Sequence, residues 1–144
     1  MDVLVDTSIW SLALRRRPDA LSAQQRQLRD GLAELVREGR VALIGPIRQE
    51  LLSGIREVTA FQQLRDRLRA FEDVPLVCED YEEAARFTNQ CRAAGVAGSP
   101  IDFVICAAAV RRGFAIFTTD ADFQRYADHI PLRLYRPEHE TTSV

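Results

Sequence analysis

The feature that most constrains the fold is a short apolar run near the start of the chain that ends abruptly in polar residues. The run Val3–Val5 stops at Asp6, and two hydroxyl residues follow. A run this short, bounded by polar residues, is typical of a strand buried on both faces of a sheet. Asp6 then falls at the carboxyl end of the strand, where open α/β sheets bind their ligands. The sequence therefore predicts a buried strand that carries a carboxylate at its ligand-binding end.

Strand and helix patterns alternate along the remaining chain, whose 144 residues suit a single domain. Ser22 with Gln25 forms a capping-box pattern, and Pro46 suits the first position of a helix. The alternation predicts a three-layer α/β/α domain over residues 1–136, with a mostly parallel central sheet of about five strands and a loose tail at 137–144. Strands are expected at 3–5, 41–44, 75–77, 114–117 and 132–135, and helices are expected to begin near residues 8, 22, 45, 58, 80, 100 and 123.

Five carboxylates are placed to meet at one edge of this sheet. Asp6 and Asp120 each follow a predicted strand, and right-handed crossovers make those strands parallel. Asp102 lies in the first turn of a predicted helix, where an acid also stabilises the helix start. Asp122 could instead be only a helix cap. Taken alone, Asp6 and Asp120 would also suit a helix cap. Glu50 has apolar neighbours, which predicts partial burial.

Clustered carboxylates repel one another unless some of them are protonated or a cation neutralises them. Mg²⁺ resolves this repulsion because it prefers hard oxygen ligands and binds through a few carboxylates together with substrate phosphate. It can also activate a bound water and stabilise the leaving oxygen. Nearby hydroxyl groups would hold the carboxylates or water in place; they belong to Thr7, Ser8, Thr118 and Thr119. The set predicts metal-dependent phosphodiester cleavage.

The composition excludes several other mechanisms. The chain has no lysine, since all 19 of its basic residues are arginine. A Schiff-base lysine, a phosphate-loop lysine and the phosphoryl-transfer chemistry of receiver domains are therefore excluded. The net charge of −2 is too close to neutral to indicate nucleic-acid binding by itself.

We expect a cytoplasmic protein. Its three cysteines lack metal-ligand spacing and are interpreted as small buried hydrophobes in a reducing compartment. The start of the chain has no signal-peptide pattern, and no apolar run approaches the ~20 residues of a membrane span.

Segments 3–8, 49–54, 100–109 and 117–123, in this order and at this spacing, resemble the PIN-domain nucleases. The chain length resembles that of the VapC toxins of bacterial toxin–antitoxin pairs, and the resemblance covers about residues 1–136. It implies an acidic metal-binding quartet, which is matched here by Asp6, Glu50, Asp102 and Asp120. An accessory acid of the family is matched by Asp122. The hydroxyl groups around the quartet are matched by Thr7, Ser8 and Thr118. The resemblance also implies an endoribonuclease that uses Mg²⁺ or Mn²⁺ and cuts structured RNA such as tRNA. The implied partners are a second copy of the chain and a cognate antitoxin.

An alternative function is a catalytically silent PIN-like module that binds RNA or a protein. The intact acidic set disfavours it, because a silent domain has no reason to keep mutually repelling carboxylates. Trp10 is expected in the core or a dimer interface rather than as a platform for a base. For RNA contact, the sequence offers several arginines, each of which would also suit an ordinary solvated surface: Arg15, Arg16, Arg17, Arg48, Arg56, Arg111 and Arg112.

Overall fold

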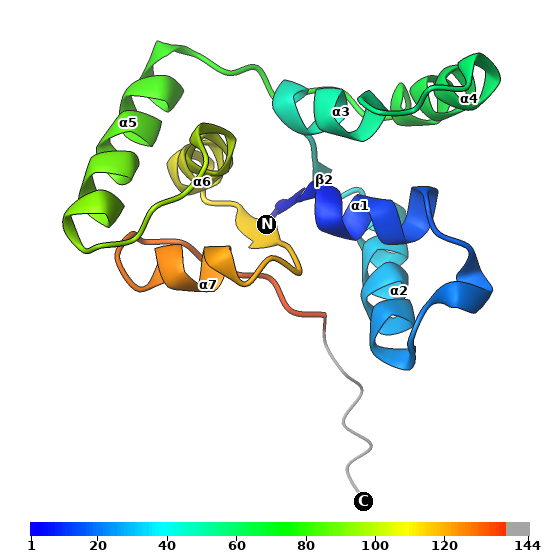
Figure 1. Ribbon diagram of the computed structural model, residues 1–144, viewed down its shortest axis with the longest axis horizontal. Helices are drawn as coiled ribbons and strands as arrows, with labels where there is room; N and C mark the ends of the chain where they lie inside the picture. Colours follow the sequence, from blue (N-terminus) through cyan, green and yellow to red (C-terminus); the bar gives the residue numbers. More distant parts are fainter. Residues whose placement is uncertain (138–144) are drawn as a thin grey trace, which may run out of the picture.

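A computed structural model describes residues 1–137 of the chain as alternating strands and helices (Figure 1). The predicted tail therefore lies outside the described residues, apart from its first residue. The elements are β1 (Val3–Val5), α1 (Thr7–Leu14), the short 3₁₀ helix η1 (Pro18–Ala20), α2 (Ala23–Arg37), β2 (Val41–Ala42), α3 (Gly45–Leu52), α4 (Val58–Leu68), α5 (Cys78–Ala93), α6 (Pro100–Arg112), β3 (Ala115–Phe117) and α7 (Asp122–Ala127).

The central sheet is parallel, as predicted, but it contains three strands in the order β2-β1-β3 instead of about five. The two missing strands are reduced to single parallel bridges, from Asp73 to Leu43 and from Leu134 to Ile116. Pro75 follows directly after the first of these segments and has no N–H to donate to a ladder, so a strand over 75–77 does not form. The bridge at Leu134 falls within the expected strand 132–135, whereas the bridge at Asp73 lies before the expected strand 75–77, and regular pairing is confined to the middle of the sheet.

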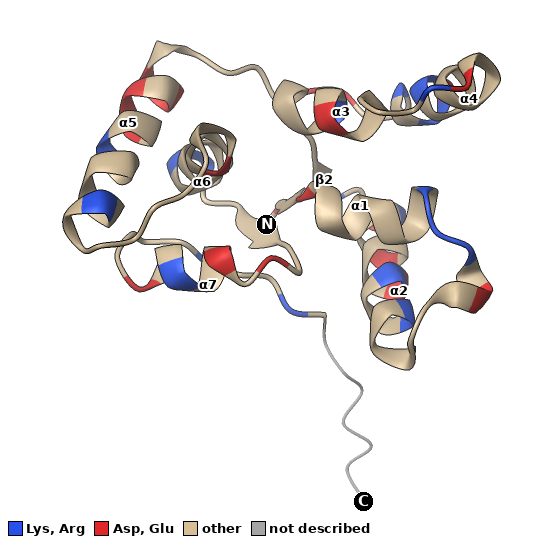
Figure 2. Cartoon of the chain, viewed as in Figure 1, with Lys and Arg blue, Asp and Glu red and all other residues tan. Residues whose placement is uncertain are grey.

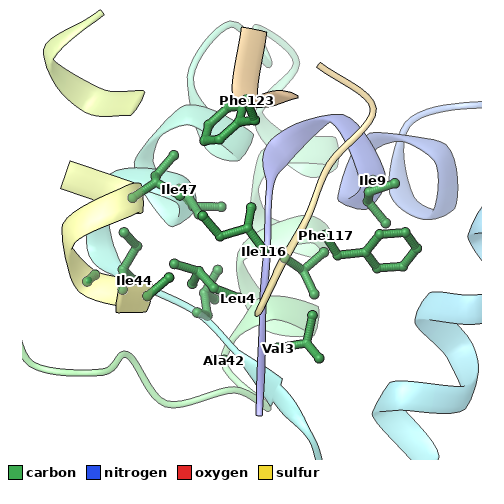
Figure 3. Packing of buried hydrophobic residues seen from close by; sticks show 14 of the residues in the cluster. Val3, Leu4, Ile9, Ala42, Ile44, Ile47, Ile116, Phe117 and Phe123 are labelled. Atoms are coloured by element: carbon green, nitrogen blue, oxygen red, sulfur yellow. The ribbon is translucent and has the colours of Figure 1, made fainter. Parts of the chain in front are cut away.

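Helices cover both faces of the sheet, which confirms the layered α/β prediction. In Figure 1, α5, α6 and α7 lie on one side of the strands, and α1 and α2 lie on the other. All three residues of β1 are completely buried. Side chains of the neighbouring strand β3 alternate between the layers, with Ile116 beside Leu4 and Phe117 turned toward the opposite face (Figure 3).

The local signals for helix ends are largely confirmed. Ser22 and Gln25 form the predicted capping box at the start of α2, with both reciprocal hydrogen bonds present. Helix α6 ends at Gly113, whose φ of 72° is left-handed and therefore favours glycine. The apolar spacing over 58–71 predicts a helix that continues to Phe71, but α4 ends at Leu68. Helix α5 begins at Cys78 rather than 80.

The packing tests the expectations about Trp10 and about the three cysteines. Trp10 is in the core, where its indole donates to the Val5 carbonyl at 3.1 Å and its ring packs edge-on against Phe71. Cys91 and Cys106 are buried, but Cys78 is exposed because it opens α5 at the surface, so the prediction for that cysteine was wrong. Within residues 1–137, no helix is long and apolar enough to cross a bilayer.

A buried ion pair fixes α5 against α6. The Asp80 carboxylate is fully buried and accepts from Arg111 at 2.6 Å and from Arg112 at 2.7 and 2.8 Å. It also accepts from the Val77 N–H at 2.8 Å, so it satisfies a free amide at the start of α5. The Arg112 guanidinium, together with these other donors, holds the pKa of Asp80 well below its ordinary value. Asp80, expected at the start of the helix, therefore lies in its first turn and also anchors two arginines.

Candidate metal centre at the carboxyl ends of the strands

The parallel pairing of β1 with β3 brings the polar residues that follow the two strands together. Val5 lies opposite Phe117, and the Asp6 N–H donates to the Phe117 carbonyl at 2.9 Å. Asp6 and Thr118 consequently occupy equivalent positions just beyond the two strands. The predicted convergence at one edge of the sheet is therefore present for these residues.

The Asp6 carboxylate takes part in this convergence instead of capping a helix. Asp6 occupies the N-cap position of α1, yet its side chain makes no capping hydrogen bond. One carboxylate oxygen accepts from the Ser8 hydroxyl at 3.0 Å and from the Thr118 hydroxyl at 2.8 Å. Only 8% of the residue is exposed. The sequence left open whether Asp6 caps a helix or belongs to the acidic site, and this geometry favours the site.

The same hydroxyl groups position the loop that leads into α7. The Ser8 oxygen accepts from the Thr119 N–H, and the Thr118 oxygen accepts from the Asp120 N–H, each at 3.0 Å. One Asp120 carboxylate oxygen in turn accepts from the Asp122 N–H at 2.9 Å, at the start of α7. A chain of hydrogen bonds therefore connects the buried Asp6 to the exposed Asp120 and to Asp122, the first residue of α7.

Three carboxylates form a compact cluster, which we call the acidic group: Asp102, Asp120 and Asp122. One oxygen from each lies within 4.8 Å of the others. The group joins the first turn of α6 to the loop and first residue of α7, where Figure 2 shows acidic residues concentrated. Arg125 is the cationic side chain within residues 1–137 that pairs with a member of the group, Asp122.

Asp102 is the most perturbed member of the acidic group. Burial raises the pKa of its carboxyl, and the nearby charges of Asp120 and Asp6 raise it further. The Tyr126 hydroxyl opposes this shift by donating to the Asp102 carboxylate at 2.8 Å. Ser99 caps α6 by accepting from the Asp102 N–H at 3.1 Å, so the predicted position in the first helical turn is confirmed. A half-buried carboxylate with a raised pKa beside two other acids is suited to gaining a cation.

Glu50 stands apart from the acidic group. It is exposed, so the prediction of partial burial was wrong, because the buried face of α3 is formed by Ile47 and Leu51. Its carboxylate accepts from the Thr7 hydroxyl at 3.0 Å, next to Asp6 in the sequence. Glu50 therefore borders the site through Thr7, and its oxygens are not among those that cluster.

The family of the chain follows from a match that spans most of its length. Residues 3–129 match the profile of the PIN domain. The chain belongs to the PIN-domain family. PIN domains are generally nucleases, which agrees with the acidic residues at the ends of the strands.

Solved structures share the fold of this PIN domain. A chain of the FitAcB crystal structure from Neisseria gonorrhoeae is 20% identical with a TM-score of 0.74, covering 95% of this chain and 99% of that one. A chain of VapBC2 from Rickettsia felis, bound to a DNA fragment from their promoter, is 16% identical with a TM-score of 0.74, covering 94% and 98%. A chain of VapBC-1 from nontypeable Haemophilus influenzae is 16% identical with a TM-score of 0.70, covering 94% and 97%.

Two residues of this PIN domain that the sequence did not single out support the acidic group. Tyr126 is fully buried, and its ring packs against Phe103 and Phe123 at centroid distances of 4.9 and 5.3 Å. A Cβ atom added to Gly98 would lie 2.3 Å from the Tyr126 hydroxyl oxygen, so the absence of a side chain there permits the tyrosine's position. No local pattern pointed to either residue, since 28 positions separate them and each acts through its contact in space.

Most of the arginines suggested for RNA contact in this PIN domain hold the chain together. Arg48 pairs with Asp73 and donates to the carbonyls of Leu68, the last residue of α4, and of Phe71 beyond it. Arg15 donates to the carbonyls of Glu50 and Leu51, which fixes the end of α1 to α3. Arg111 and Arg112 bind the buried Asp80, as described above. The three remaining candidates make no side-chain hydrogen bond within residues 1–137 and are left as solvent-facing cations: Arg16, Arg17 and Arg56.

Proposed function

We propose that this PIN domain is a divalent-metal-dependent endoribonuclease that acts as the toxin of a toxin–antitoxin pair. The observation that supports this proposal most directly is the acidic group beside Asp6. Its oxygens approach within 4.8 Å, and one of its carboxyls has a pKa raised by burial and by its neighbours. Hard oxygen donors in such a cluster match the preference of Mg²⁺, for which Mn²⁺ would substitute.

Asp102, Asp120 and Asp122 would hold the metal, with Asp6 contributing from the end of β1. The bound ion would supply Lewis-acid chemistry, activating water and neutralising charge on the phosphodiester. Ser8 and Thr118 act as positioning residues, because their hydroxyls fix the Asp6 carboxylate and the Asp120 loop. Glu50, a member of the acidic quartet that the resemblance implies, is proposed to act from the border of the site, where Thr7 contacts it.

The proposed partners follow from the family and from the similar structures. The names of those structures, VapBC and FitAcB, are those of paired proteins, and two other structural matches are a toxin–antitoxin complex from Klebsiella pneumoniae and DNA-bound VapBC from Salmonella typhimurium. We therefore propose a cognate antitoxin as protein partner and a homodimer as the assembled form. RNA such as tRNA is proposed as the substrate, and the cytosol as the compartment.

Calorimetry with Mn²⁺ and RNA cleavage assays test the proposal together. We expect Asp120→Asn to abolish both site-specific Mn²⁺ binding and RNA cleavage, because it removes a charged ligand from the acidic group. Asp30→Asn is a matched control, since Asp30 is exposed on α2 and, among residues 1–137, its carboxylate pairs with its neighbour Arg29 alone. EDTA should stop cleavage by the wild-type protein.

Three results would count against the proposal. Cleavage of RNA that persists in EDTA would exclude the metal role. Absence of any Mn²⁺ binding that Asp120→Asn removes, in a correctly folded protein, would favour the silent binding module instead. Cleavage of a DNA oligonucleotide in preference to the same sequence in RNA would reject RNA as the substrate.

A further inference from the structure

A polar cleft lies directly beside the acidic centre and shares Asp120 with the metal-binding residues proposed above. It has a volume of about 730 Å³, within the range of ligand-binding pockets of about 300–1,000 Å³. Ser8, Thr118, Thr119 and Asp120 form one wall, so the cleft begins at the loop that carries the acidic group. Its other walls come from α1, the first turns of α2, the start of α7 and the segment 134–137, which includes Tyr135 and Arg136. A molecule held in the cleft would therefore be next to the reacting phosphodiester.

Three glutamine side chains line this cleft. Gln24 and Gln124 make no side-chain hydrogen bond with any other residue of 1–137. The side-chain amide oxygen of Gln25 accepts from the Ser22 N–H in the capping box, and the side-chain NH₂ group of Gln25 is left free to donate. Amide side chains offer a donor and an acceptor side by side, the arrangement that pairs with base edges. The cleft thus carries unused polar groups suited to reading a base.

The cleft also offers an apolar surface and two cations, Arg16 and Arg136. Leu12, Leu28 and Phe117 contribute apolar atoms that suit the flat faces of a base. Arg16 follows the C-terminal end of α1, whereas Ser8, which contacts the Asp120 loop, lies in the first turn of that helix; Arg16 makes no ion pair within residues 1–137. A guanidinium is suited to bidentate contact with phosphate. Its neighbour Arg17 does not line the cleft, although it lies in the same run of basic residues after α1 (Figure 2).

From this combination we propose that the cleft is a subsite for one unpaired RNA nucleotide next to the cleaved phosphodiester. The glutamine amides contact the edge of the base, and Arg16 contacts a neighbouring phosphate. The acids at one end repel phosphate in the absence of a cation, so the backbone of this nucleotide is favoured at the Arg16 end. Because a base in a duplex has its edge occupied by its partner, the subsite selects single-stranded RNA or a loop. The inference rests on the proposed function, since it places the substrate of the same site.

Binding of short RNA, measured by fluorescence anisotropy in EDTA with the Asp102→Asn protein, tests the subsite without cleavage. We expect Arg16→Ala to weaken binding of a single-stranded oligonucleotide about threefold or more at low salt. We also expect it to reduce the slope of log affinity against log salt by about 0.7, the value for one phosphate contact on a single strand. Arg17→Ala removes the same charge from the adjacent position and should leave the slope nearly unchanged.

The glutamines are tested by base preference. The double variant Gln24→Ala, Gln124→Ala should reduce the affinity ratio between the best-bound and worst-bound homopolymers about fivefold or more. Gln62→Ala is the control, because Gln62 is exposed on α4 and outside the cleft. Circular dichroism establishes that each variant is folded. Equal salt slopes for the Arg16 and Arg17 variants, an unchanged base preference, or equal binding of duplex and single strand would each overturn the subsite.

These outcomes are separable from those of the proposed function. If the wild-type protein cleaves RNA with Mn²⁺ while the cleft variants bind normally, the subsite is rejected and the nuclease is retained. If binding depends on Arg16 and the glutamines but no metal-dependent cleavage occurs, the subsite is retained and the nuclease is rejected.

Discussion

Replacing Gly98 with alanine should destabilise this protein, although Gly98 is exposed and its backbone conformation suits any residue. Its φ is not in the left-handed region, so alanine would meet no backbone strain. At an exposed position of this kind, Gly→Ala ordinarily stabilises by about 0.4–1 kcal/mol. The structure predicts the opposite sign because of one buried neighbour, Tyr126.

The magnitude follows from the contacts of the added methyl group. It would lie 2.3 Å from the Tyr126 hydroxyl oxygen, 2.7 Å from Cζ and 2.9 Å from Cε1. The tyrosine ring cannot move away easily, since it is fully buried between Phe103 and Phe123. Forced overpacking of this kind costs about 1–3 kcal/mol. Any movement of the ring would also disturb its hydrogen bond to Asp102.

Urea unfolding followed by circular dichroism measures this effect. With an m-value of about 2 kcal/mol/M, a loss of about 2 kcal/mol lowers the midpoint by about 1 M. Gly45→Ala is the matched control, because its nearest atom would be 3.9 Å away and it opens helix α3, so we expect no loss. Adding Tyr126→Phe to Gly98→Ala should recover part of the stability by removing the closest contact. A midpoint for Gly98→Ala equal to or above the wild type would refute the steric reasoning.

Two further predictions concern a buried carboxylate and an exposed thiol. Asp80→Asn should lower the free energy of unfolding at pH 7 by an amount toward the lower end of about 3–5 kcal/mol, since Arg111 is 32% exposed. Because the folded pKa of Asp80 is lowered, its contribution is present above the unfolded value of about 3.9 and is lost as the pH falls toward the folded value. Urea midpoints between pH 7 and 3 should therefore fall less steeply in the variant, and parallel curves would contradict this. Native thiol labelling with Ellman's reagent should be fast at Cys78 alone, because burial raises the pKa values of Cys91 and Cys106; rapid labelling of all three would be inconsistent with the packing.

Much of the fold could be predicted because the signals for it are local. The apolar run Val3–Val5 and the capping box at Ser22 each act within a few residues of the backbone. The outer strands could not be predicted as reliably, because regular pairing there depends on the neighbouring segment. Residues 75–77 are apolar enough for a strand, yet Pro75 and the start of α5 leave no room for a ladder.

The sequence by itself determined that acids follow two parallel strands, because strand ends and helix starts are set by the order of residues. Only the tertiary structure decided which carboxylate oxygens gather, that Asp6 binds hydroxyls instead of capping α1, and that Glu50 remains at the border of the site. It also decided that Tyr126 supports Asp102 and that Arg16, unlike Arg112, faces an open cleft. The physical reason is that these contacts join residues far apart in the chain. They depend on how each helix is rotated against the sheet, which no short segment specifies.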